Sequence, residues 1–307
     1  MSEASRRDFL AGVAVGAVAG SAGLKAETAS PADKAIPTVP LGNHRVTRLI
    51  LGGNPIRGFS HSVQKLSDLM REYFTVPRIT DLLMHAEEEG INTFQMSYAP
   101  NIGAALNAAR ERGSRMQWIC LTHAGDESIL KDILALKPIA IAHHGNRTDE
   151  YFQTGRQQQV RDYVKKVHDL GLLAGISTHC PKHVAMIEDL GWENDFYMTC
   201  LYYLTRTPDE LKLIYGDALV NVREEPFVKG DPERMTKQIR ATKKTCLAFK
   251  ILAAGRNCTN AENVEDCFRF AYQKIKPTDA VIVGMYPVLN DEVRMDADLG
   301  RKYSRAS

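Results

Sequence analysis

The sequence has few of the features that mark several large classes of protein. Its six cysteines are spread along 307 residues without a close CxxC pair, so a cysteine-based zinc site is not expected. The net charge is only +2, which gives no sign of a nucleic-acid partner. Beyond the N-terminal segment no apolar run is long enough to span a bilayer, so we expect no membrane span in the mature chain.

The N-terminal segment has the pattern of an export signal. Residues 5–10 read S-R-R-D-F-L and precede an uncharged stretch, residues 11–24, that is rich in Ala, Gly and Val. A basic start followed by such a stretch is typical of a signal peptide, and the Arg6-Arg7 pair predicts the twin-arginine route. We therefore expect a signal over residues 1–30, export by the twin-arginine translocase to a periplasmic or other extracytoplasmic location, and a single domain over residues 31–307.

The rest of the chain alternates short apolar runs with amphipathic stretches. Strands are expected at 46–51, 91–96, 116–122, 138–142, 172–177, 195–201, 245–251 and 279–283. Helices are expected at 77–90, 102–112, 127–136, 153–170, 181–190, 208–215, 231–243 and 261–274. The strand runs lack regular alternation, as in parallel sheets covered on both faces. The pattern predicts an α/β fold, a (β/α)8 TIM barrel, with a doubly wound open sheet as the structural alternative and insertions at 60–76 and 218–230.

Histidines gather at the ends of three consecutive predicted strands. Functional groups of a barrel lie on the loops that follow its strands. Imidazole binds divalent metals and transfers protons near neutral pH. We therefore predict an active site with His123 and His143 as catalytic residues, and with a divalent metal as a candidate cofactor. A polar loop or core position is the alternative for each of the four histidines that would hold that metal, which are His123, His143, His144 and His179.

Other polar residues also follow predicted strands. Lys250 interrupts an apolar run near the end of the seventh strand, where it could stabilise an oxyanion or exchange a proton. A lysine that extends between the barrel and the helices is the alternative. Tyr98 is a candidate proton donor. A small polar substrate is expected to contact Asn54, Arg57, Gln95 and Tyr202. The candidate cofactor-binding residues are Gly255, Arg256 and Gly284.

Three stretches of the chain resemble the aldo/keto reductase superfamily. They are P-L-G-N at residues 40–43, V-T-R-L-I-L-G-G at residues 46–53 and E-G-I-N-T-F at residues 89–94. The resemblance covers most of the mature chain by the order of its elements. It implies a (β/α)8 barrel and, as in ordinary members, carbonyl reduction with NADP as the cofactor.

The residues that carry catalysis in that family are mostly replaced. Gln95 stands where the family has an aspartate, and the tyrosine position falls near Pro100, two residues from Tyr98. The family lysine aligns with Thr122 or His123. The segment that usually carries a basic residue for the cofactor phosphate reads G-M-Y-P at residues 284–287. The strand-four histidine is retained as His143 or His144.

This pattern predicts altered chemistry on a retained fold. Hydride transfer to a carbonyl needs a proton donor and a bound nicotinamide, and the usual residues for both are replaced. We expect a metal-assisted lyase or isomerase that abstracts a proton next to the carbonyl of a sugar-like substrate. An NADP-dependent oxidoreductase with Tyr98 or His143 as its donor is one alternative, and a non-catalytic barrel that binds a small ligand is another.

Overall fold

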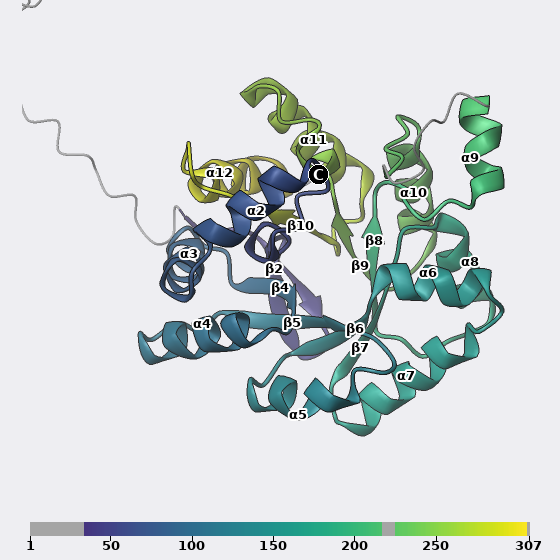
Figure 1. Ribbon diagram of the computed structural model, residues 1–307, viewed down its shortest axis with the longest axis horizontal. Helices are drawn as coiled ribbons and strands as arrows, with labels where there is room; N and C mark the ends of the chain where they lie inside the picture. The colour runs from purple at the N-terminus through teal and green to yellow at the C-terminus, as the bar shows by residue number, and fades with distance from the viewer. Residues whose placement is uncertain (1–33, 217–224, 306–307) are drawn as a thin grey trace, which may run out of the picture. The chain divides into compact units, whose positions relative to one another are not determined.

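The computed structural model describes residues 34–216 and 225–305. Eight parallel strands close into a barrel in the order β10-β3-β4-β5-β6-β7-β8-β9, and the helices surround it (Figure 1). The (β/α)8 barrel predicted from the sequence is thereby confirmed, because β10 pairs with both β3 and β9 and leaves no open edge. The predicted signal lies outside the described residues, as do residues 218–224 of the second predicted insertion.

Strands and helices alternate along the chain as expected. The barrel strands are β3 (Leu49–Gly52), β4 (Thr93–Ser97), β5 (Gln117–Thr122), β6 (Ala140–His143), β7 (Leu173–Thr178), β8 (Phe196–Cys200), β9 (Thr245–Phe249) and β10 (Ala280–Gly284). The α-helices are α2 (Gln64–Tyr73), α3 (Val76–Glu88), α4 (Pro100–Glu111), α5 (Glu127–Ala135), α6 (Gly145–Gln153), α7 (Gln158–Asp169), α8 (Pro181–Asp189), α9 (Pro208–Tyr215), α10 (Asp231–Ala241), α11 (Ala261–Lys274) and α12 (Glu292–Ser304). Two 3-10 helices are η1 (Pro55–Arg57) and η3 (Ala253–Gly255). In this described part, no helix has the length and apolar character needed to cross a membrane.

A β-hairpin precedes the barrel and corrects the first strand prediction. The run at 46–51 is divided between β2 (His44–Thr47) and β3, and β2 pairs in antiparallel fashion with β1 (Thr38–Leu41). The turn contains Gly42 at a φ of 55°, a left-handed conformation that glycine adopts without a steric penalty. Side chains of the hairpin, Val39 and Val46 among them, pack with the interior of the barrel and close the end at which its strands begin.

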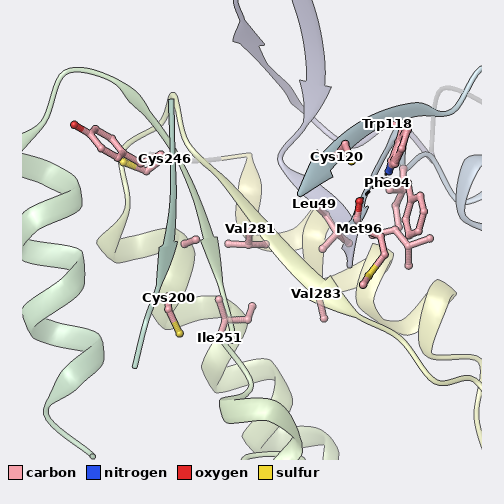
Figure 2. Close-up of a cluster of buried hydrophobic side chains, with 14 of the residues drawn as sticks. Leu49, Phe94, Met96, Trp118, Cys120, Cys200, Cys246, Ile251, Val281 and Val283 are labelled. Atoms are coloured by element: carbon pink, nitrogen blue, oxygen red, sulfur yellow. Dashed lines mark hydrogen bonds between the residues drawn. The ribbon is translucent and has the colours of Figure 1, made fainter. Parts of the chain in front are cut away.

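Alternation along the strands divides the core into two layers. The barrel interior contains Ile119, Ala140, Ala142, Phe196, Met198, Leu247 and Ile282. Side chains at the intervening positions pack between the barrel and the helices. Figure 2 shows part of this outer layer, in which the indole Nε1 of Trp118 donates to the carbonyl oxygen of Met96 at 3.1 Å. Because successive side chains of a strand point to opposite faces, the same alternation decides which strand-end residues face the barrel mouth.

Candidate functional site

The strand alternation brings three of the four predicted histidines to the barrel mouth. His144 follows the interior residue Ala142 by two positions, and His123 and His179 stand in the equivalent places after β5 and β7. His144 is the N-cap residue of α6. These three side chains therefore continue the interior face of the barrel beyond its last layer of apolar residues.

His143 points to the opposite face. Its Nδ1 lies 2.8 Å from Oγ1 of Thr148, and its ring packs edge-on against Tyr163 with the centroids 5.2 Å apart. Because the Thr148 hydroxyl donates to a backbone carbonyl at 3.1 Å, it accepts from Nδ1–H of His143. Burial lowers the pKa of His143 to about 3. The expectation that His143 shares a site with the other three histidines is therefore corrected, since this ring belongs to the layer between barrel and helices.

An open cavity of about 520 Å³ lies at the ends of β4, β5 and β6. Four residues expected at the site line it: Arg57, Tyr98, His123 and His144. The Tyr98 hydroxyl donates to Oδ2 of Asp132 at 3.3 Å. Gln95, which is 8 % exposed, occupies the interior face of β4 below the cavity. The cavity therefore places polar side chains from three neighbouring strands around one space.

A buried carboxylate that the sequence gave no reason to single out organises this region. Asp149 on α6 is fully buried and accepts hydrogen bonds from five donors. They are the hydroxyl of Thr178, the backbone N–H of His179 at 2.9 Å, Nδ1 of His179 at 2.9 Å, Nδ1 of His183 at 2.8 Å and the hydroxyl of Thr205 at 2.8 Å. Burial alone would raise the pKa of Asp149, but the hydrogen bonds from the two rings outweigh it and hold the pKa well below its usual range. Asp149 is therefore an anion at neutral pH.

The carboxylate of Asp149 fixes the tautomer of His179. Since Nδ1 of His179 must donate to the carboxylate, Nε2 of the neutral ring carries a lone pair. The ring packs edge-on against Phe249 with the centroids 5.6 Å apart. It also lies so close to Gly145 that a Cβ there would stand 2.9 Å from its Cε1. Among the described residues Nε2 has no hydrogen-bond partner, so it is available to accept a proton from a ligand.

A second histidine balances the charge of Asp149. Burial would lower the pKa of His183, but its hydrogen bonds to Asp149 and Cys180 outweigh this and raise the pKa to about 9. The ring also stacks on Phe152 at a centroid distance of 4.5 Å. At neutral pH His183 is therefore a cation that forms an ion pair with Asp149.

The raised pKa of His183 predicts a pH dependence of stability. Because the folded state binds this proton more tightly than the unfolded state does, the stabilisation is fully present below a pH of about 6.5 and is lost as pH rises through about 9. The wild type should therefore be more stable than His183→Gln at low pH. We expect this advantage in the free energy of unfolding to shrink by about 3 kcal/mol as the pH rises over this range. Urea denaturation at pH 6 and pH 9.5 measures it, and an unchanged difference would contradict the assignment.

Lys250 belongs to a second polar cluster at the mouth. Its Nζ donates to Nε2 of His61 at 3.0 Å, and Nδ2 of Asn54 lies 3.1 Å from the same nitrogen. With two donors at Nε2, the proton of the His61 ring resides on Nδ1, which is 2.7 Å from Oε2 of Glu225. Lys250 and His61 have φ angles of 58° and 53°, a strained left-handed conformation for residues with a Cβ. Strain in both partners of one contact is typical of functional regions.

The two clusters share an electrostatic environment. Burial is the main cause that lowers the pKa of His144 to about 4, and its electrostatic interactions with His179, His123 and Lys250 act in the same direction. Burial would raise the pKa of Glu225, but His61 and the charge of Lys250 lower it. At neutral pH the mouth therefore presents a neutral His144 together with an ionised Glu225, which contacts His61, the partner of Lys250. Nδ1 of His144 is buried and has no hydrogen-bond partner within the part of the chain that the structure describes.

The predicted metal site is not assembled. In residues 34–216 and 225–305 no three His, Cys, Asp or Glu side chains are grouped so that they could hold a metal ion. Nδ1 of His179 is used on Asp149, Nδ1 of His123 donates to the carbonyl of Ala124 at 2.7 Å, and His143 faces the helices. The four histidines predicted as a ligand set are thus divided among different partners, and this expectation is corrected.

The predicted cofactor residues make internal contacts. Arg256 lies over the ring of Phe227 at 3.9 Å and donates to the carbonyl of His61 at 3.0 Å. Gly255 is the last residue of η3 and has a φ of 85°. Gly284 lets Pro55 pack on the end of β10, since a Cβ at Gly284 would lie 2.7 Å from Cδ of Pro55. Arg256 is the cation among these residues, and it contacts Phe227 and His61. The residues present therefore do not fit the phosphate of NADP in the way that the resemblance implies.

The predicted substrate residue Tyr202 is occupied by packing. Its ring is 7 % exposed and lies 5.0 Å from the ring of Phe227, and its hydroxyl accepts from Asn257 at 3.4 Å. Four residues of the site were not singled out from the sequence. They lie on helices or in insertions, far along the chain from their partners, and they are Asp149, His183, His61 and Glu225. The sequence offers no spacing signal that would have joined them.

Comparison with known proteins agrees with this architecture. No family model and no curated protein matches the sequence. The solved structure of Gox0644 in its apo form matches with a TM-score of 0.51 at 10 % identity, over 89 % of this chain and 97 % of that chain. This likeness agrees with the (β/α)8 barrel of the chain.

Two further structures are similar at lower scores. The glycerol dehydrogenase AKR11B4 from Gluconobacter oxydans matches at 11 % identity with a TM-score of 0.49, over 89 % of this chain and 97 % of that one. A probable 2-pyrone-4,6-dicarboxylic acid hydrolase from Acinetobacter baumannii, with citric acid bound, matches at 12 % identity with a TM-score of 0.43, over 74 % of this chain and 84 % of that one. At such identities the likeness extends to the fold alone, and function must be argued from the site.

Proposed function

We propose that the chain is an enzyme that abstracts a proton next to the carbonyl group of a sugar-like substrate, as lyases and isomerases do. The observation that carries the proposal is the pair formed by Asp149 and His179 at the barrel mouth. The buried carboxylate of Asp149 binds Nδ1 of His179 and leaves Nε2 available. This arrangement allows a histidine to act as a general base.

Each residue has a role in this proposal. Nε2 of His179 accepts the proton from carbon, and Asp149 stabilises the imidazolium that forms. The ammonium group of Lys250 stabilises the negative charge that develops on the carbonyl oxygen. His144, which lines the cavity, remains neutral, so its ring can accept a hydrogen bond from a substrate hydroxyl. No step uses a metal or a nicotinamide, because the residues described above do not fit either group.

A panel of aldoses and ketoses incubated with the protein in D2O tests the proposal. We expect deuterium at the carbon next to the carbonyl in at least one sugar, detected by NMR, and a loss of at least about a hundredfold in rate for His179→Gln. His168→Gln is the matched control, since His168 forms a similar pair with Asp195 at 2.8 Å on the surface. NADPH oxidation without exchange would replace the proposal with NADP-dependent carbonyl reduction, and sugar binding without turnover would replace it with a ligand-binding barrel.

We also propose that the protein is exported by the twin-arginine route. The Arg6-Arg7 pair before an uncharged stretch supports this. A double substitution of Arg6→Lys and Arg7→Lys is expected to retain the protein in the cytoplasmic fraction of an expressing cell, whereas Arg45→Lys is not. Equal export of both variants would contradict the route.

A further inference from the structure

Arg57 is a cation of the cavity without a carboxylate partner. Its side chain is half-buried, and Nη1 donates to the carbonyl of Tyr98 at 3.1 Å. Its guanidinium also lies 5.7 Å from the ring of Phe59. Within the described ranges no carboxylate lies at ion-pair distance from Arg57. A guanidinium carries five N–H donors, so most of its donors remain available to a ligand in the cavity.

The carboxylates that line the same cavity are already engaged. Glu150 accepts from Arg147 at 2.7 Å and from Arg156 at 2.6 Å. Asp126 accepts from the hydroxyl of Thr122 at 2.5 Å and from the backbone N–H of His123 at 3.1 Å, and Nε2 of His123 is 3.4 Å from it. Among the described residues that line the cavity, Arg57 is therefore a cation without a carboxylate partner.

The beginning of α6 adds to the positive potential of the cavity. His144, Asn146 and Arg147, which form the N-cap and first turn of this nine-residue helix, line the cavity. The first N–H groups of a helix have no partner within the helix, and its dipole favours negative charge at that end. The N-cap side chain does not accept a hydrogen bond from them. The first turn of α6 and the Arg57 guanidinium thus line the same cavity.

We propose that the substrate carries a carboxylate, which binds between Arg57 and the N-terminal turn of α6. The planar fork of a guanidinium matches a carboxylate, to which it donates two parallel hydrogen bonds. A cavity of about 520 Å³ accommodates a six-carbon sugar acid. This inference rests on the proposed function, whose substrate class it narrows from a sugar to a sugar acid.

Binding of gluconate and sorbitol to the full chain, measured by calorimetry, tests the inference without turnover. The two compounds share a six-carbon polyol chain and differ in one terminal group. We expect gluconate to bind at least about tenfold more tightly than sorbitol, and Arg57→Gln to remove that difference. Arg57→Lys should retain part of it, because the charge remains while the planar fork is lost. Arg161→Gln, at a surface pair with Glu193, is the control that should retain it in full.

Equal affinities for gluconate and sorbitol, or a preference that Arg57→Gln leaves intact, would overturn the inference. Inorganic phosphate that binds more tightly than gluconate would overturn it as well, because the site would then select a tetrahedral anion. The proposed function is judged separately by deuterium exchange. A protein that exchanges deuterium into neutral sugars and shows no carboxylate preference would keep that function and lose this inference.

Discussion

Replacement of Asp149 with asparagine is expected to lower the rate of deuterium exchange by a factor of about 10²–10⁴. The amide has nearly the same size but no charge, and its NH₂ group can donate to His179, which would place the lone pair of the ring on the wrong nitrogen. The imidazolium that forms during proton abstraction would also lose its counter-charge. Initial rates at pH 7, with near-ultraviolet circular dichroism on the same samples, measure the effect on folded protein.

Asp195→Asn serves as the matched control for this substitution. Asp195 holds His168 at 2.8 Å, as Asp149 holds His179, but both partners are about one-third exposed and lie away from the cavity. We expect its exchange rate to remain within about twofold of the wild type, because surface pairs contribute little. A folded Asp149→Asn protein that retains more than a tenth of the wild-type rate would contradict the assigned role.

The largest expected effect on stability is that of Asp231→Ala. Asp231 and Arg206 form an ion pair in which both side chains are 3 % exposed, and Asp231 also accepts from the backbone N–H of Tyr203 at 3.1 Å. Removal of the carboxylate leaves a buried guanidinium without a counter-charge, which costs about 3–5 kcal/mol. We expect the free energy of unfolding, measured with urea, to fall by this amount.

An exposed pair provides the comparison for Asp231. Asp68 pairs with Arg71 at the surface, where the two side chains are 51 % and 48 % exposed. Asp68→Ala should therefore lower the free energy of unfolding by less than about 1 kcal/mol. Similar losses for the two variants would show that burial does not decide the contribution of these ion pairs.

Much of the fold could be predicted from the sequence where local signals agree. The bounds predicted for α9 and α11 are those observed, because Thr207 and Asn260 cap the two helices through hydrogen bonds to the third helical residue. The helix predicted at 153–170 corresponds to α7 but was placed to begin five residues too early, since a turn in which Gly155 has a φ of 70° separates α7 from α6. The long polar sequence of this region gives no signal for such a break. The helix α12 was not predicted.

The candidate site was predictable only in part, for a geometric reason. The ends of the predicted strands indicated His144, His179 and Lys250. In the sequence A-I-A-H-H at the end of β6, however, the residues before the two histidines are all apolar, so the pattern does not show which histidine points into the barrel. Pairing in the closed barrel decides this. Asp149 lies 30 positions before His179 on a helix that was not predicted, so its role depends on tertiary contacts.

The protonation state of His179 tests the central claim most directly, since it does not depend on knowing the substrate. Two-dimensional ¹H–¹⁵N NMR of the imidazole groups, with His179→Gln for assignment, distinguishes the tautomers. We predict that the ring carries its proton on Nδ1, which faces Asp149, and a lone pair on Nε2. A ring that carries its proton on Nε2, or on both nitrogens, could not accept a proton from carbon and would contradict the account.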